Sequence, residues 1–231
     1  MTDATMTRVE VARAIEVCSD VLPRSVPLDK RMLDIVGSLV GLMLLAPFFG
    51  VLTLLISLDS PGGAIYRQRR VGLRGSHFDM YKFRTMYAGN DPDAHRAYVS
   101  RLILQGSDDL RNGDGDYKLK DDPRITRVGG VLRRFSLDEF PQLLNVLAGE
   151  MSLVGPRPPL EYECELYTPR HRRRLDVVPG MTGLWQVSGR NETTFDEMID
   201  LDLEYVEHRS LFLDLRILAR TVPVVLGARG A

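Results

Sequence analysis

The sequence predicts an α+β, mainly helical protein made of a re-entrant membrane helix-break-helix and a compact domain with a small β-hairpin. Three observations predict it. Residues 35–58 contain no charged residue, residues 64–86 form two strand-like segments around glycines, and several later segments carry apolar residues at helical spacing. At 231 residues the chain can hold one good-sized core with an appendage. We expect an N-terminal amphipathic or flexible segment (1–27), the membrane helix (28–59) and the compact domain (60–231).

Charge is nearly balanced over the whole chain, at a formal net value of −1, and we expect no nucleic-acid partner. The arginines are nevertheless clustered, which suits phosphates or anionic lipid head groups, although a solvated surface is the alternative. The clusters are Arg67, Arg69, Arg70 and Arg74, and Arg170, Arg172, Arg173 and Arg174. Two distant cysteines without a CxxC motif, and scattered histidines, indicate neither a zinc site nor a disulfide framework, so a reducing compartment fits.

The first 27 residues carry a short amphipathic pattern that Pro23 and Pro27 end. We expect a loose helix that packs on the main body, with a membrane surface as the alternative. Mixed charges in this segment argue against a cleavable signal peptide.

The uncharged run from Ile35 to Leu58 is long enough to enter a membrane. As a straight helix its 24 residues would measure about 36 Å, against a hydrocarbon core of about 30 Å. Pro47 lies near its middle, where proline kinks a helix. Lysine and arginine flank both ends, which places both ends on the cytoplasmic side. A helix that bends at Pro47 and returns satisfies both signals; the alternative is a kinked span with the N-terminal tail outside.

A β-hairpin is expected where Ile65–Gln68 and His77–Thr85 flank a turn around Gly72 and Gly75. Period-two alternation in the second strand places four side chains on one face. They are Phe78, Met80, Lys82 and Arg84. The two cations could hold a phosphate, although lysine and arginine are also common on edge strands for other reasons.

The remaining segments alternate between loops and helices. Residues 88–122 are polar, with a short helix expected over 96–104 and a mobile loop over 106–116. Residues 161–174 read as a helix interrupted by Pro169, and residues 179–190 as a shaped binding loop or a turn-rich structural loop. Two further helices are expected around 195–205 and over 211–226. The last carries too much charge for a second span, so it packs on the core or lies at an interface.

An adjacent carboxylate pair, Asp138 and Glu139, lies in the stretch around which the chain is organised, residues 133–158. Ser136 to Glu139 also fits a capping box, with Ser136 as the N-cap of a helix whose dipole would keep Asp138 ionised. Pro141 disagrees with a helix that begins at Ser136, so the helix begins one or two residues later. Because cations flank the pair on both sides, it suits a reaction on phosphate: one acid holds a divalent metal while the other attacks.

Four motifs stand out together: Lys30-Arg31-Xaa-Xaa-Asp34, Tyr81-Lys82-Phe83-Arg84-Thr85-Met86, Ser136-Leu137-Asp138-Glu139 with Pro141-Gln142-Leu143, and Met151-Ser152-Leu153-Val154-Gly155-Pro156-Arg157-Pro158. With them the chain resembles, over about residues 28–223, the small monotopic phosphoglycosyl transferases, a family of bacterial sugar transferases. One departure is Ala46-Pro47, where many members have serine before the proline. The later stretch from Gly180 to Arg190 is similar to that of longer members that act on UDP-hexoses.

The resemblance implies a two-step transfer of hexose-1-phosphate from a UDP-hexose to undecaprenyl phosphate, with release of UMP. Asp138 would carry the phospho-sugar covalently, and Glu139, beside Asp138, would bind Mg²⁺. Arg133 and Arg157 would hold phosphate oxygens. The turn formed by Pro156, Arg157 and Pro158 would contact the nucleotide, and Lys82 and Arg84 are weaker candidates for the same pocket.

Membrane association would place the enzyme at the bacterial inner (cytoplasmic) membrane, monotopic in the phospholipid bilayer, with residues 60–231 as a cytoplasmic catalytic domain. It would perform the first membrane step of exopolysaccharide, O-antigen or glycoconjugate synthesis. A glycosyltransferase that releases UDP and a non-catalytic membrane-anchored scaffold are the alternatives. The identity of the sugar and the oligomeric state, including a homodimer, stay open at this point.

Overall fold

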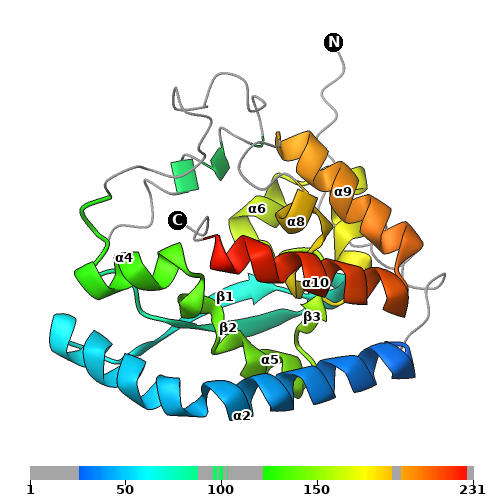
Figure 1. Ribbon diagram of the computed structural model, residues 1–231. Helices are drawn as coiled ribbons and strands as arrows, with labels where there is room; N and C mark the ends of the chain where they lie inside the picture. Colours follow the sequence, from blue (N-terminus) through cyan, green and yellow to red (C-terminus); the bar gives the residue numbers. More distant parts are fainter. Residues whose placement is uncertain are drawn as a thin grey trace.

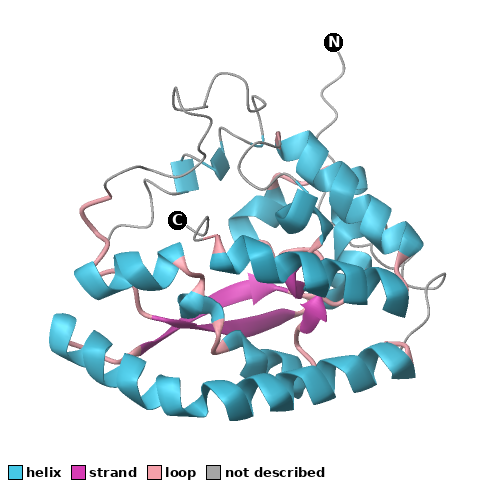
Figure 2. Cartoon of the chain, in the orientation of Figure 1, coloured by secondary structure: helices cyan, strands magenta, loops and turns pink. Residues whose placement is uncertain are grey.

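The computed structural model describes residues 26–87, 96–97, 99–100, 103, 122–188 and 194–227. The expectations for residues 1–25 and for the loop 106–116 lie outside these ranges. Helices dominate the described chain, and the strands form two small two-stranded sheets, as Figures 1 and 2 show. The prediction of a mainly helical α+β protein with a small hairpin is confirmed.

Helix α2 (Leu28–Asp59) runs along one side of the molecule, and the hairpin and α5 (Gln142–Ala148) lie above it in Figure 1. It is long and apolar enough to cross a membrane, and is the single such helix in the described ranges. The helix continues through Pro47, so the structure shows no interruption there, but Figure 1 shows it bending with its convex side away from the body. Its exposed apolar side chains include Leu28, Met32, Val36, Leu39, Val40, Met43, Leu44, Phe48, Val51, Leu54, Leu55 and Leu58.

The N-terminal end of α2 is bound to the rest of the protein by polar side chains. Lys30 Nζ donates to the carbonyl of Val154, at 2.8 Å, and to Asp214 Oδ2, at 2.8 Å. Asp34, which is buried, accepts from the hydroxyl of Ser152 and from the amide of Leu153, both at 2.9 Å. These contacts fix α2 to strand β3 (Ser152–Val154) and to helix α10 (Leu211–Leu226).

Close packing extends these contacts along the inner face of α2. A Cβ atom at Gly37 would lie 2.5 Å from Leu153 Cδ1, so glycine allows the helix to approach β3. Arg31 donates to the carbonyls of Val146 and Leu147, both at 2.7 Å. These carbonyls lie in the last turn of α5, where that of Val146 also accepts from the amide of Gly149 at 3.1 Å, so the guanidinium adds a donor at a helix end.

The C-terminal end of α2 is bound to the same body. Asp59 accepts from the amide of Val128 at 3.0 Å, at the start of α4 (Arg127–Arg134). Arg84 donates to the carbonyls of Ser60 and Pro61, at 2.7 and 2.9 Å. Both ends of α2 are therefore held by one domain.

The expected hairpin is present. Strands β1 (Ile65–Val71) and β2 (His77–Phe83) pair antiparallel, with Ile65 opposite Phe83 and Val71 opposite His77. A short 3₁₀ turn (Leu73–Gly75) joins them. The other edge of β2 is paired by a side chain: Asn145 on α5 accepts from the amide of Tyr81 at 3.0 Å and donates to the carbonyl of Asp79 at 2.8 Å. One amide thus replaces a neighbouring strand and ties α5 to the hairpin.

The second sheet corrects the expectation of a loop over 179–190. Strand β4 (Gly180–Thr182) pairs parallel with β3, and α8 (Leu184–Ser188) follows it. Glycines allow the strands to meet, because a Cβ atom at Gly180 would lie 2.0 Å from the amide nitrogen of Gly155. Local turn residues gave the loop prediction, whereas pairing with a distant strand decides the structure.

Helices cover the remaining faces. The expected helix over 161–174 is present and broken before Pro169: α6 spans Glu161–Glu165, α7 spans Pro169–Arg172 and a 3₁₀ turn spans Arg173–Asp176. Helix α9 (Phe195–His208) begins with a capping box between Thr194 and Glu197. Helix α10 packs one face inward through Ile217, which is buried, and leaves Phe212 exposed on the other. Residues Arg96, Ala97, Val99, Ser100 and Ile103 are helical, within the short helix expected there.

Candidate active site

The carboxylate pair lies on a single 3₁₀ turn (Leu137–Glu139) between α4 and α5. The capping-box expectation is wrong: Ser136 is left-handed, with φ at 55°, and its side chain caps nothing. Helix α5 begins at Gln142 with Pro141 at its N-cap position. Phe140 and Pro141 have right-handed helical backbone angles, but proline has no amide hydrogen to donate within a helix, so the regular helix starts after Pro141.

Asp138 is buried, with 9% of its surface exposed. Burial raises the pKa of its carboxyl group, and the charge of Glu139 raises it further. The positive charges of Lys82 and Arg133 lower the same pKa and only partly offset burial. The expectation that a helix N-terminus keeps Asp138 ionised is therefore not confirmed, because burial dominates and the pair precedes α5.

Glu139 forms an ion pair with Lys82, with 3.1 Å between Oε1 and Nζ. Both side chains are largely enclosed, at 26% and 15% exposure, so solvent screens the pair less than it screens a surface pair. Burial lowers the pKa of Lys82, whereas Glu139 raises it. The strand alternation that predicted the position of Lys82 is confirmed, because Lys82 lies on β2 and its side chain reaches Glu139.

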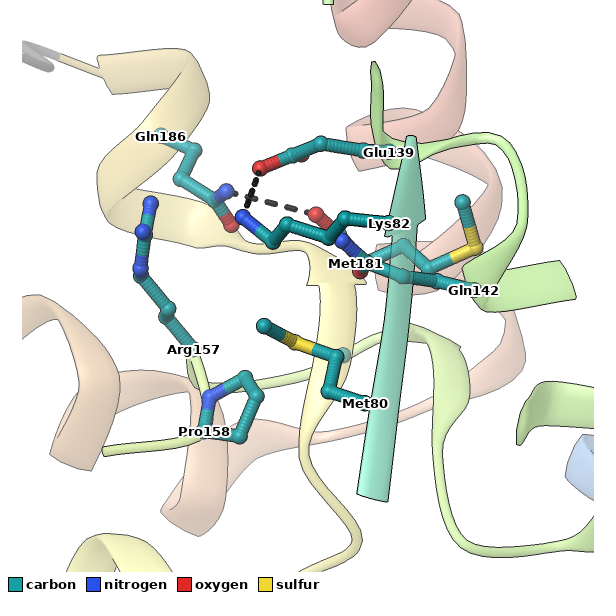
Figure 3. A pocket seen from close by; sticks show the side chains of 9 residues that line it. Met80, Lys82, Glu139, Gln142, Arg157, Pro158, Met181 and Gln186 are labelled. Atoms are coloured by element: carbon teal, nitrogen blue, oxygen red, sulfur yellow. Dashed lines mark hydrogen bonds and ion pairs between the residues drawn. The ribbon is translucent and has the colours of Figure 1, made fainter. Parts of the chain in front are cut away.

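A pocket opens at this ion pair, as Figure 3 shows. It draws residues from β2, the 3₁₀ turn, α5, the stretch after β3, β4 and α8, and its cavity volume is about 10 Å³. That is room for about one water molecule, so a nucleotide sugar would bind mostly at the mouth. The lining residues are Met80, Lys82, Glu139, Gln142, Arg157, Pro158, Gly180, Met181 and Gln186.

Two of the predicted cations lie elsewhere. Arg133 donates through Nε to Thr85 Oγ1 at 3.0 Å, and its charge acts on Asp138 from the side of α4. Arg84 does not reach the pocket, which corrects the expected phosphate clamp. Strand β2 ends at Phe83, so the alternation that predicted Arg84 stops there, and its guanidinium binds the end of α2 instead.

The turn of Pro156, Arg157 and Pro158 places Arg157 at the pocket. Its prolines donate no hydrogen bond, so it is held through its carbonyls. Four successive carbonyls accept from four distant donors, and each donor is part of a sheet or a buried side chain. They are Pro156 from the Gly180 amide (2.8 Å), Arg157 from Arg174 Nη2 (3.3 Å), Pro158 from Arg70 Nη1 (2.9 Å) and Pro159 from the Val71 amide (3.0 Å).

The two arginines that hold this turn are buried members of the predicted clusters. Arg70 and Arg174 are 5% and 3% exposed. Arg174 also pairs with Asp202 and donates to the hydroxyl of Tyr167 at 2.8 Å. Burial lowers the pKa of Arg70 to about 10, which still leaves it charged at neutral pH. Neither arginine lines the pocket, and their hydrogen bonds to the turn fix the shape of the site.

The donor set fits a magnesium ion held mainly by substrate. No group of three or more His, Cys, Asp or Glu residues suited to a metal occurs in the described ranges. Mg²⁺ is commonly bound by one or two carboxylates together with substrate phosphates and water. Glu139 lines the pocket and Asp138 adjoins it, so two carboxylates are available for that arrangement.

Five pocket residues were not among the predicted site residues, and two of these five have polar side chains, Gln142 and Gln186. Each lies in a stretch that the sequence did mark. Gln142 follows Pro141 in the motif around the carboxylate pair, and Gln186 lies within the expected binding loop 179–190. Their polarity inside apolar helical turns was the available signal.

Comparison with known proteins matches the chain to one family. A family profile described as "Bacterial sugar transferase" matches residues 26–228. Exopolysaccharide production protein ExoY of Rhizobium meliloti is 41% identical over 202 residues, 87% of this chain and 87% of that protein. Undecaprenyl-phosphate galactose phosphotransferase of Salmonella typhimurium is 41% identical over 217 residues, 94% of this chain but 44% of that protein.

This chain covers an intermediate share of the length of a third relative. UDP-glucose:undecaprenyl-phosphate glucose-1-phosphate transferase of Caulobacter vibrioides is 41% identical over 215 residues, 89% of this chain and 73% of that protein. The chain thus spans most of some relatives and less than half of others. With the profile covering nearly all of its length, the chain belongs to the bacterial sugar transferase family and is a phosphoglycosyl transferase.

Proposed function

We propose that this enzyme transfers hexose-1-phosphate from a UDP-hexose to undecaprenyl phosphate and releases UMP. The observation that carries the proposal is one buried carboxylate, Asp138, beside a pocket that holds Glu139, Lys82 and Arg157. Two of the relatives support it, because their names describe transfer of galactose phosphate and of glucose-1-phosphate to undecaprenyl phosphate.

The first step forms a covalent enzyme. A carboxylate oxygen of Asp138 attacks the phosphorus that bears the hexose, and the bond from that phosphorus to the bridging oxygen of the diphosphate breaks. UMP leaves with the bridging oxygen. Because burial raises the pKa of Asp138 and leaves the carboxylate poorly solvated, its ionised form is the more reactive nucleophile.

The second step regenerates the enzyme. A phosphate oxygen of undecaprenyl phosphate attacks the same phosphorus, and the bond to Asp138 breaks. The products are undecaprenyl diphosphohexose and the free carboxylate. One site therefore serves both substrates in turn, which predicts ping-pong kinetics.

The cations of the site stabilise negative charge on the transferred phosphoryl group. Lys82 and Arg157 line the pocket and would contact phosphate oxygens, while the charge of Arg133 acts on Asp138. Glu139, with Asp138 beside it, would hold Mg²⁺, which when bound neutralises the diphosphate and favours departure of UMP.

The two anchored ends of α2 support a re-entrant topology. A straight helix of 32 residues would measure about 48 Å and would leave its ends on opposite sides of a bilayer. Lys30 and Asp59, near the two ends, are both bound to the body that carries the carboxylate pair. We infer that the bent helix dips into the cytoplasmic leaflet of the inner membrane and returns. The catalytic domain then lies where the phosphate of a lipid acceptor lies.

The proposal is tested by UMP release from a panel of UDP-hexoses with undecaprenyl phosphate and Mg²⁺. We expect Asp138→Asn to lower turnover about a thousandfold or more, because no carboxylate remains to attack. The variant should be at least as heat-stable at pH 7. The pKa of Asp138 is raised in the folded protein, so the folded state loses stability as pH rises through that pKa, and asparagine does not ionise.

Different products separate the alternatives. Release of UDP in place of UMP would indicate a glycosyltransferase that moves the sugar without its phosphate. Normal UMP release by Asp138→Asn would disprove the covalent mechanism, and a membrane-bound protein without turnover on any donor would favour the scaffold. A chelator should stop the reaction, and added Mg²⁺ should restore it.

A further inference from the structure

Gln186 presents a buried acceptor atom at the pocket. Of the side-chain oxygen and nitrogen atoms that are buried without a hydrogen-bond partner in the described ranges, Gln186 Oε1 is the one that belongs to a pocket-lining residue. Figure 3 shows the amide directed toward the space shared by Lys82 and Glu139. A buried acceptor without a donor is unfavourable, so a ligand group that donates a hydrogen bond to this atom would be stabilised in the pocket.

The orientation of the amide is set by its other end. Gln186 Nε2 donates to the carbonyl of Met181 at 3.3 Å, so Oε1 is the end of the amide that is left without a partner. Met181 lies on β4, and β4 is joined to the arginine-bearing turn through the Gly180 amide and the Pro156 carbonyl, at 2.8 Å. The free acceptor is therefore fixed relative to Arg157.

The chemistry of the acceptor excludes one partner and favours another. Phosphate oxygens only accept hydrogen bonds at neutral pH, so they cannot pair with an amide oxygen. A hydroxyl group can donate to it. The cavity beside Gln186, at about 10 Å³, is the size of one such group. With Lys82 and Arg157 available for phosphate oxygens, the neutral acceptor faces the part of the donor next to the phosphate.

We propose that Gln186 Oε1 accepts a hydrogen bond from a hydroxyl group of the donor's hexose, so that Gln186 contributes to the choice of sugar. This inference rests on the proposed function, because it takes the hexose phosphate to be held by Lys82 and Arg157. It assigns the stretch after β4 a contact with the sugar.

The test compares wild type, Gln186→Met and Gln186→Glu in UMP release. The donors are the preferred UDP-hexose and its analogues that each lack one hydroxyl. In wild type, one analogue should lose about tenfold in kcat/KM. Gln186→Met should lose about tenfold on the parent donor and nothing further on that analogue, because the contact is already absent. Gln186→Glu keeps an acceptor oxygen and should keep the dependence on that hydroxyl.

Two failures are distinguishable. If wild type releases no UMP from any UDP-hexose, the proposed function fails and the inference fails with it. If wild type is active and Gln186→Met depends on every hydroxyl as strongly as wild type does, the inference alone is overturned. Thermal unfolding of each variant confirms that a folded protein is compared, and Gln186→Glu supplies a second readout if Gln186→Met unfolds.

Discussion

Asp138 faces three charged groups that act on its pKa in opposite directions. Burial and Glu139 raise the pKa, whereas Lys82 and Arg133 lower it, and the net change is a rise. Since the proposed nucleophile is the ionised form, the balance among these groups sets the lower pH limit of the reaction. Burial also leaves the carboxylate poorly solvated, which makes its ionised form more reactive.

Lys82→Gln should move the acidic limb of the pH profile for UMP release to higher pH. Of the two positive charges that lower the pKa of Asp138, Lys82 has the larger effect. Without it the carboxylate is protonated at a higher pH. Turnover should also fall about tenfold or more, because a phosphate contact is lost. The measurement is UMP release against pH, each profile normalised to its own maximum.

Arg84→Gln is the matched control, because Arg84 binds the end of α2 and does not line the pocket. Its acidic limb should coincide with that of wild type. A limb that moves to lower pH in Lys82→Gln, or that moves equally in the control, would contradict this account of Asp138.

At the scale of single residues, the sequence predicted the positions that depend on local pattern. The carboxylate pair and Lys82 were found because adjacency and strand alternation extend over a few residues. Arg84 was misplaced because the alternation was extended one residue past the end of β2. The capping of Ser136 was wrong because a left-handed turn before Pro141 competes with a helix start, and the sequence allowed both.

At the scale of elements, the turn after β3 depends on donors that are distant in sequence. Arg70 lies 88 residues before the Pro158 carbonyl that it holds, and Arg174 lies 17 residues after Arg157. The clusters were interpreted as surfaces for phosphates or anionic lipid head groups, or as solvated surface, yet their buried members Arg70 and Arg174 donate to the backbone of the turn. No periodicity reports such a contact, because it is set by how β1, β4 and the turn meet in space.

Arg70→Met should lower kcat/KM for the UDP-hexose about tenfold through displacement of Arg157, and should destabilise the protein by about 1–3 kcal/mol. The reason is that the buried Pro158 carbonyl would lose its donor. Because Arg70 acts through Arg157, the double variant with Arg157→Met should lose little more than Arg157→Met alone. The measurements are steady-state UMP release and denaturant unfolding.

Arg69→Met is the matched control, since Arg69 is an exposed neighbour on the same strand. It should change stability by less than about 0.5 kcal/mol. Additive losses in the Arg70 and Arg157 double variant would show that Arg70 contacts the substrate independently. If Arg69→Met lost as much activity and stability as Arg70→Met, removal of one positive charge would explain both effects.

At the scale of the whole molecule, the membrane helix and the site form one assembly. Lys30 and Asp34 hold β3, whose continuation bears Arg157, and Arg31 holds the end of α5, whose start follows the carboxylate pair. Movement of α2 would therefore displace both the turn that bears Arg157 and the carboxylate pair. The sequence predicted the helix from composition alone, but its polar attachments needed the fold, since those at its N-terminal end join residues more than a hundred positions apart.

The topology of α2 can be decided by labelling single cysteines with a membrane-impermeant reagent. In a protein with Cys18 and Cys164 replaced by alanine, we expect Leu28→Cys and Gly63→Cys to react from the same, cytoplasmic side of sealed vesicles. Both positions are exposed, and a side chain at Gly63 meets only an ordinary contact. Phe48→Cys, at the exposed middle of the helix, should be protected by lipid and should react after detergent is added.

Reaction of the two end positions from opposite sides would establish a complete span and would contradict the anchoring of both ends to one body. The contacts of Lys30 with Val154 and of Asp59 with Val128 could not then exist together in the membrane. A same-side result together with protection at Phe48 would place both ends of α2, and the body to which they are bound, on the cytoplasmic face of the bilayer. The phosphate of a polyprenyl acceptor, whose chain stays in the hydrocarbon, could then reach Asp138 without leaving the bilayer surface.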